Sequence, residues 1–347
     1  MSAFLHDLGR HAFLQHALLA GLLASVACGV VGTYVVARRI TYIAGAISHC
    51  VLGGIGAARW LSVRAGWDWL QPLHGAVVAA VAAALVIGVV SLRAKQREDT
   101  VIGALWAVGM AAGILFIART PGYQEDLIGY LFGNILMVSG RDLWLVAGLD
   151  AAVVLLGLLF YHQFQAVSFD GEFARLRGVR VETFYLLLLV LAALTVVLLV
   201  TVVGIVLVIA LLALPAAVAG HFARTLWQMM GLAALASAVF TTGGIALSYG
   251  ANLPAGAVIV LLAGLLIIWL TGYVSAASIA GAAALPFLIL IFQWRSQPWV
   301  SFVMTLALGT VIILKHRPNI ARLRAGTEKR IFERTRPDQN SGEDRSS

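Results

Sequence analysis

The sequence carries little charge for its length. Only 12% of its 347 residues are charged, whereas 61% are hydrophobic. A soluble domain has roughly 25% charged residues, and its core could not hide so much apolar surface. Cysteine is also scarce: Cys28 and Cys50 are the only two, and both lie inside apolar runs. This excludes a disulfide framework and a CxxC metal site.

Motifs for nucleotide binding and hydrolysis are missing as well. There is no GxxxxGK[ST] phosphate loop, because none of the three lysines follows a glycine, and neither GxSxG nor HExxH occurs. The chain therefore cannot bind ATP in the P-loop manner. Any energy source has to come from a partner or an ion gradient.

What the sequence has instead is a series of long apolar runs. They are about 17 to 25 residues long, the length a helix needs to cross the hydrocarbon, and strict alternation of apolar and polar residues is absent. We therefore predict an all-α polytopic membrane protein with about eleven spans, since helices and not a barrel fit this pattern. The expected spans are 17–37, 40–58, 73–92, 101–117, 143–161, 184–203, 205–219, 226–247, 255–270, 274–292 and 299–314. The apolar stretch 127–138 is too short to cross and predicts a re-entrant or half-buried helix, and 1–15 predicts an interfacial lead-in, not a cleaved signal.

The net charge of +8 fits membrane topology better than a polyanionic partner, because the basic residues lie between the runs or after the last one. If every span crosses once, three loop clusters and the tail share one side, which the positive-inside rule makes the cytoplasm. The N-terminus is then outside and the C-terminus cytoplasmic; Arg59, Arg64 and Arg119 fall on the outer side and weaken the rule. The cytoplasmic residues are Arg38, Arg39, Arg93, Lys95, Arg97, Arg175, Arg177, Arg180, Lys315, Arg317, Arg322, Arg324, Lys329 and Arg330.

Two residues inside spans stand out as candidates for metal contact. Asp150 lies mid-span, where a carboxylate costs roughly 2.5–3.5 kcal/mol, so it is either a pathway residue or a hydrogen-bonded structural acid, and we favour the first. His49 offers an imidazole, a common ligand for zinc, manganese or iron, or else a donor for an interhelical hydrogen bond. His74, His162 and His221 lie near span ends, where an interfacial role is expected.

A short amphipathic segment follows the fifth span. Phe169, Phe173 and Leu176 recur at helical spacing, with charged residues between them. Such a segment either docks into a groove of another protein or lies on the lipid surface.

From about residue 13 to 270 the chain resembles the permease subunits of metal-ion ABC importers, of the zinc, manganese and iron type. The motifs that carry the resemblance are YIAGAISHCVLGG (42–54), GYLFGNILMVS (129–139), FDGEFARLRGV (169–179), VGIVLVIALLALPA (203–216) and LSYGANLPAG (247–256). It implies a homodimeric permease or one paired with a second permease subunit, an extracytoplasmic metal-binding protein that delivers the cation, and a separate ATPase that binds ATP. It also favours the docking interpretation of the amphipathic segment, whose coupling residues are Phe169, Asp170, Glu172, Phe173, Arg175 and Gly178.

Three positions depart from the family pattern, each by the loss of an acid. The family usually has Asp four residues before His49, Asp in its YLFGD motif and Asp before Leu-Pro; here these are Gly45, Asn134 and Asn252. Their loss predicts weaker binding of hard divalent cations and a shift toward nitrogen-rich coordination. We expect His49 and Asp150 to line the cation path, with Asn134 and Asn252 in supporting positions.

A second resemblance covers the end of the chain. GYVSAASI (272–279) and HRPNIARLRAGTE (316–328) are similar to the last part of the glycerol-3-phosphate acyltransferase that uses acyl-phosphate. It implies a phosphate-binding and catalytic face of Ser275, His316, Asn319 and Glu328, but the earlier catalytic loops of that family are not found upstream. The segment is therefore expected to be a fusion remnant or a two-helix appendage whose basic end contacts lipid phosphates.

Together these observations predict a permease domain over 1–271 with about nine helices, a two-helix segment over 272–331 and a disordered polar tail over 332–347. The expected function is import of divalent transition metals across a bacterial cell membrane by alternating access, with no enzymatic activity in this chain. The alternatives are a lipid-synthesis acyltransferase and a secondary transporter that needs no ATPase.

Overall fold

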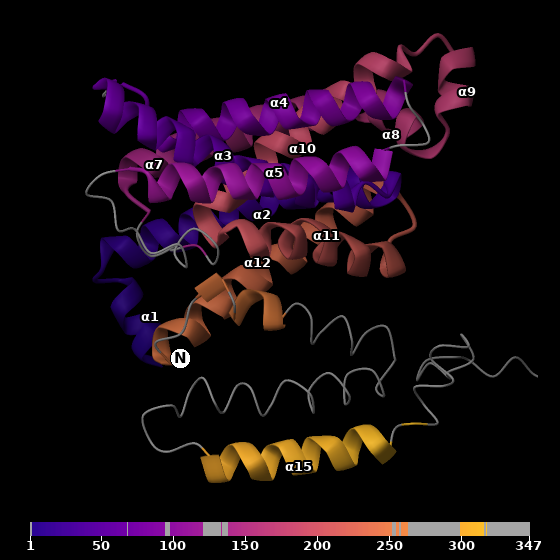
Figure 1. Ribbon diagram of the computed structural model, residues 1–347. Coiled ribbons are helices and arrows are strands. Elements are labelled where there is room, and N and C mark those ends of the chain that lie inside the picture. Colours follow the sequence, from indigo (N-terminus) through magenta and orange to yellow (C-terminus); the bar gives the residue numbers. More distant parts are fainter. Residues whose placement is uncertain are drawn as a thin grey trace, which may run out of the picture. The chain divides into compact units, whose positions relative to one another are not determined.

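In a computed structural model, the part of the chain that is described comprises residues 2–67, 69–93, 98–120, 133, 138–251, 255–256, 258–262, 299–315 and 317. Within these residues every regular element is a helix, and no strand occurs (Figure 1). This confirms the all-α prediction. The helices are α1 (Ser2–Leu8), α2 (Ala12–Arg38), α3 (Thr41–Ala65), α4 (Pro72–Arg93), α5 (Glu98–Ala118), α7 (Gly140–Leu159), α8 (Tyr161–Phe169), α9 (Gly171–Leu176), α10 (Val181–Val203), α11 (Ile205–Phe222), α12 (Leu226–Ala251) and α15 (Trp299–Lys315).

Six of the described helices are long and apolar enough to cross a membrane: α2, α3, α4, α5, α10 and α12. The pair formed by α7 and α8, bent by 71°, makes a seventh if it counts as one span. These match expected spans, but the predicted total of eleven is not established. The expected span 274–292 and most of the stretch 127–138 lie outside the described residues, and 255–270 is described only in part.

The outward faces of these helices are apolar, as lipid contact requires. Val78 on α4 is 69% exposed, and Val108 and Leu115 on α5 are each 65% exposed. In water such a surface would be an aggregation hazard. In a bilayer this apolar surface can contact the lipid chains.

Glycine allows α3 to approach its two neighbours, α4 and α5, very closely (Figure 1). Gly54 on α3 and Gly75 on α4 face one another so closely that a Cβ on either would overlap the other's carbonyl oxygen. On the α5 side, a Cβ at Gly109 would lie 2.7 Å from Cys50 Cα, and the Cys50 thiol donates a hydrogen bond to the Leu105 carbonyl at 3.3 Å. Small residues that bring backbones together are the usual basis of helix packing in membranes.

Helix α2 is as buried as α3, and it packs against α7, α10, α11 and α12. Tyr34 near its C-terminal end is fully buried, donates its hydroxyl to the Gly157 carbonyl of α7 at 3.0 Å, and meets Phe164 of α8 edge-on. The helical stretch breaks between α10 and α11 at Gly204, whose φ of +82° favours glycine. The sequence places its break between two spans at this glycine too.

The chain divides into two compact units, residues 1–263 and 264–347. In the first unit the predicted N-terminal lead-in contains a helix, α1, which is tied to the C-terminal end of α12. The Tyr249 hydroxyl donates to Asp7 Oδ2 at 3.0 Å, and its ring meets Phe4 edge-on. Of the second unit, α15 and Arg317 are described.

Candidate functional site

His49 projects from α3 toward α5. Its ring stacks on the Trp106 indole, with ring centroids 4.6 Å apart and an interplanar angle of 23°. His49 Nδ1 is buried and has no hydrogen-bond partner among the described residues. The predicted interhelical hydrogen bond is therefore not formed by this nitrogen, which keeps a free lone pair or proton inside the bundle. A buried polar atom left without a partner costs about 1–3 kcal/mol, so it signals a role beyond packing.

Asp150 lies on α7, is only 6% exposed, and faces α2. Its Oδ1 accepts a hydrogen bond from the Ala27 backbone N–H at 3.2 Å. This matches the structural alternative, a hydrogen-bonded acid, although it leaves the second carboxylate oxygen available. Asp150 contacts α2, whereas His49 contacts α5, so the two side chains face different helices.

The structure does not describe the other two candidate metal-contact residues. Asn134 and Asn252 lie outside the described residues. In the described part of the chain no group of three or more His, Cys, Asp or Glu side chains is close enough to hold a metal ion. His74, His162 and His221 are exposed at helix ends, where the sequence predicts interfacial residues.

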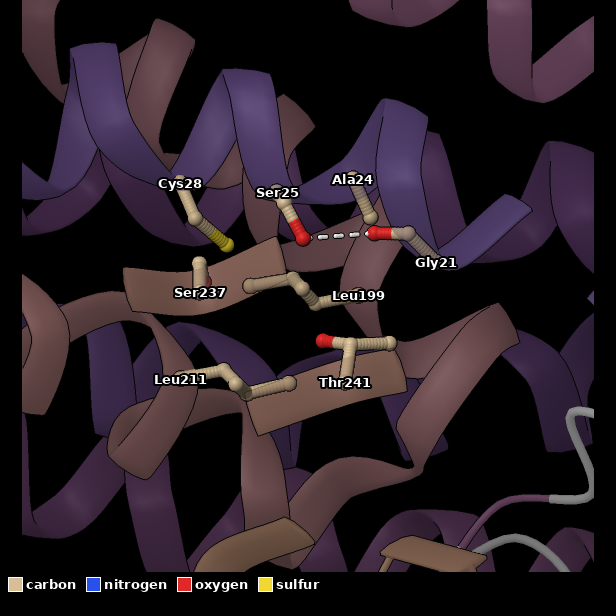
Figure 2. A pocket seen from close by; sticks show the side chains of 8 residues that line it. All are labelled: Gly21, Ala24, Ser25, Cys28, Leu199, Leu211, Ser237 and Thr241. Carbon is tan, nitrogen blue, oxygen red and sulfur yellow. Dashed lines mark hydrogen bonds between the residues drawn. The ribbon is translucent and has the colours of Figure 1, made fainter. Parts of the chain in front are cut away.

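A small, partly open crevice lined by both hydroxyl-bearing and apolar side chains lies between α2, α10, α11 and α12 (Figure 2). Ser25 Oγ there donates to the Gly21 carbonyl at 2.7 Å, and Figure 2 shows the Cys28 sulfur beside Ser237. Ser237 Oγ is buried and faces the Cys28 thiol, and Thr241 lies one turn further along α12. Sequence reasoning missed this pocket. The signal for it is the spacing of four between Ser237 and Thr241, which puts two hydroxyls on one helix face.

The amphipathic segment predicted after the fifth span is present, but as two helices, not one. Asp170 ends α8 and caps α9: its Oδ1 accepts the Phe173 N–H at 2.9 Å. An N-cap residue has non-helical backbone, so Phe169 belongs to the preceding helix. The side chains of Phe169, Phe173 and Leu176 are nevertheless all exposed, by 66%, 53% and 87%. We call these three residues the coupling surface.

Charged residues surround the coupling surface. Arg175 and Glu182 form an exposed ion pair at 3.3 Å, and the Arg177 guanidinium lies 5.2 Å from the centroid of the Phe173 ring. Gly178, with φ +81°, provides the turn that leads into α10. An apolar centre with a charged rim is the usual composition of a protein docking site.

The coupling surface lies at the same end of the bundle as two of the predicted cytoplasmic clusters. The Arg38 guanidinium lies 5.6 Å from the Tyr185 ring, and the Tyr185 hydroxyl is 3.1 Å from Ser91 Oγ, next to the end of α4. Phe184, also at the start of α10, packs edge-on against Phe164 of α8 at 6.1 Å. The C-terminal ends of α2 and α4 therefore meet the α8 region at the start of α10.

A family model, described as the ABC 3 transport family, matches residues 10–274. The chain belongs to this family. It is thus a transport permease subunit and not an enzyme, as the sequence motifs predict. The match covers the five motifs and ends at residue 274, at the start of the predicted C-terminal segment 272–331.

Relatives and one solved structure agree with this assignment. The chain is 40% identical to a "Probable metal transport system membrane protein" of Chlamydia pneumoniae over 76% of this chain and 90% of the relative. It is 36% identical to the "Manganese transport system membrane protein MntC" of Halalkalibacterium halodurans over 76% and 88%. The structure "PsaBC from Streptococcus pneumoniae in complex with Fab" matches with a TM-score of 0.69 at 33% identity, covering 78% of this chain and 94% of that one. The multi-pass membrane fold of a bacterial transport permease is therefore established for this chain.

The structure does not describe the four acyltransferase-like residues. Ser275, His316, Asn319 and Glu328 lie outside the described residues, and the domain boundaries at 271 and 331 stay predictions.

Proposed function

We propose that this chain is the membrane-spanning subunit of an ATP-driven importer of divalent transition-metal ions, with zinc, manganese or iron as the transported cation. Relatives at 36–40% identity carry metal or manganese transport in their names, and the family is one of ABC transport permeases. The observation that carries the proposal is His49 Nδ1, a buried nitrogen without a hydrogen-bond partner in the described part of the chain. Of these three metals, zinc and iron suit an imidazole nitrogen best, whereas manganese prefers oxygen ligands.

Asp150, Asn134 and Asn252 complete the proposed cation path, Asp150 with its free carboxylate oxygen and the two asparagines with amide oxygens. The test is uptake of radioactive manganese and zinc by cells that carry His49→Ala or Asp150→Asn. We expect a loss of about tenfold or more for His49→Ala, the scale of losing a group that acts on a metal. His162→Ala, an exposed histidine at a helix end, is the control. Unchanged uptake in both path variants would remove His49 and Asp150 from the pathway.

The coupling surface binds a separate ABC ATPase, which supplies the ATP that this chain cannot bind itself. Its exposed phenylalanines and Leu176 fit an apolar groove, and the charged residues around them fit a polar rim. The test is co-purification of the permease with the ATPase. Phe169→Asp should abolish it, whereas Trp69→Asp, which changes a residue 68% exposed outside the segment, should not. Retention of the ATPase by a chain with residues 169–178 scrambled would instead favour a secondary transporter.

In this proposal the end that carries the coupling surface faces the cytoplasm. Arg38 and Arg93, the last residues of α2 and α4, lie at that end, as the positive-inside rule expects, and the N-terminus is then outside and the C-terminus inside. An extracytoplasmic metal-binding protein delivers the cation to the opposite end. A second permease copy encloses the path from the other side, and membrane lipids cover the exposed apolar faces of α4 and α5.

Residues 272–331 form an appendage with a basic end that contacts lipid phosphates, followed by a polar tail over 332–347. The acyltransferase-like motifs there lack the rest of that family's site, so purified protein should not transfer acyl groups from acyl-phosphate to glycerol-3-phosphate. Transfer that is lost on His316→Ala would overturn this part of the proposal.

A further inference from the structure

The His49 imidazole is held by an aromatic partner on a different helix. Trp106 of α5 stacks on it almost in parallel, at 4.6 Å and 23°, and Tyr42, two turns before His49 on α3, contacts the same indole at 5.7 Å. One face of the imidazole is therefore covered. A metal binds a histidine nitrogen along its lone pair, in the plane of the ring, so this stacking fixes the ring without obstructing the direction of coordination.

The indole occupies space that only glycine leaves free. Gly45 lies four residues before His49, on the same face of α3. A Cβ at Gly45 would lie 2.9 Å from Trp106 Cζ3, 3.1 Å from Trp106 Cη2 and 2.9 Å from Ile209 Cδ1. Carbon atoms pack at about 3.5–4.0 Å, so any larger residue at position 45 has to displace the indole.

Moving the two helices apart to relieve such a clash would break other close contacts between them. Gly109 touches the Cys50 backbone one turn after Trp106, and the Cys50 thiol bonds to the Leu105 carbonyl beside it. These contacts fix the spacing of α3 and α5 at the level of the stack. A change in the side-chain conformation of Trp106 is therefore the less costly response, and it ends the contact with His49.

We propose that Trp106 is a positioning residue for cation transport and orients the His49 imidazole. Gly45, which has no side chain, leaves the room that the indole occupies. This inference rests on the proposed metal-import function. The indole also occupies the volume that a carboxylate at position 45 would fill, so it keeps a hard oxygen ligand away from His49. The site consequently favours cations that accept nitrogen ligands, such as zinc, over manganese.

The first test compares two replacements of Trp106 that both fill space. Trp106→Phe keeps an aromatic ring against His49, whereas Trp106→Leu does not. Zinc uptake by intact cells should stay within about threefold of the unaltered protein for Trp106→Phe and fall about tenfold or more for Trp106→Leu, the effect expected of a group that orients a metal ligand. The control is Trp144→Ala, which removes an indole that is 81% exposed. Protein abundance in the membrane and the thermal midpoint are measured for every variant.

The second test is a double-mutant cycle between Gly45→Ala and Trp106→Leu. Because the added methyl group acts by displacing the indole, Gly45→Ala should lower zinc uptake, and adding it to Trp106→Leu should lower uptake no further. In the same cells, the pair Gly45→Asp with Trp106→Ala should raise the ratio of manganese to zinc uptake. Gly45→Asp alone should raise the ratio less, because the Trp106 indole still occupies the space that the carboxylate needs.

The outcomes separate the two claims. Three results would overturn the role of Trp106 while the importer itself still works. They are additive losses in the double-mutant cycle, equal zinc uptake by Trp106→Phe and Trp106→Leu, and an unchanged ratio of manganese to zinc uptake. No uptake of any of the three metals by the unaltered protein with its ATPase would overturn the proposed function, and this inference with it.

Discussion

Gly109→Ala offers a direct test of the contact between α3 and α5 that presents His49. The added Cβ would lie 2.7 Å from Cys50 Cα, 2.9 Å from its sulfur and 3.1 Å from its backbone nitrogen. Two of these three atoms belong to the backbone of a helix, so no side-chain movement removes the clash. The helices would have to separate locally by about 1 Å to restore normal contact distances.

The expected cost follows from two opposing terms. Overpacking typically destabilises by about 1–3 kcal/mol, and replacing a helical glycine with alanine returns about 0.5–1 kcal/mol. We therefore expect Gly109→Ala to lose about 1–2 kcal/mol net, a fall of about 2–4 °C in the thermal midpoint of the detergent-purified protein. Metal uptake should fall as well, because the stack on His49 lies one turn away.

The matched control is Gly103→Ala on the same helix. A Cβ at Gly103 would meet nothing within 4 Å, so this variant should be neutral or slightly more stable. If both variants unfold at the same temperature, the close approach of α3 and α5 described above is wrong.

Three further predictions concern the segments outside the bundle. Asp170→Ala removes the N-cap of α9 and should destabilise this helix by about 1 kcal/mol. The expected signs are faster amide exchange at Phe173 and weaker co-purification of the ATPase, and unchanged exchange at Phe173 would contradict this prediction. Arg175→Ala should leave the thermal midpoint unchanged, because its ion pair is exposed, and a clear fall would refute this. Hydrogen bonds from His6 and the Tyr249 hydroxyl lower the pKa of Asp7 below its ordinary 3.8. The Asp7 carboxylate therefore stabilises the folded protein at pH values above 3.8, and this stabilisation is lost as the pH falls through the lowered pKa. The difference in thermal midpoint between the unaltered protein and Asp7→Asn should be constant at neutral pH and vanish in strong acid.

The membrane spans could be predicted from sequence because a single physical length governs them. An apolar run must match the bilayer, so α2 to α5, α10 and α12 were all located from composition alone. The break at Gly204 was equally readable, since a glycine between two apolar runs permits a conformation that other residues avoid.

The partners of the candidate residues could not be predicted in this way. The sequence picks out His49 and Asp150 as polar groups in apolar runs, but which helix each one faces depends on packing. Trp106 follows His49 by 57 positions and Ala27 precedes Asp150 by 123, and no periodicity within one helix carries that information. The split of the amphipathic segment at Asp170 was missed for a different reason: the apolar spacing continues across the cap, so the pattern alone favours one helix.

The central claim is that this chain moves a divalent metal only when a partner hydrolyses ATP. The most direct measurement is zinc and manganese uptake into vesicles that hold the permease and its ATPase, with the metal-binding protein outside and ATP or a non-hydrolysable analogue inside. The account predicts metal uptake when the vesicles contain ATP, and no uptake when they contain the analogue or when the permease carries Phe169→Asp. Equal uptake with the analogue, driven instead by an imposed ion gradient, would contradict it.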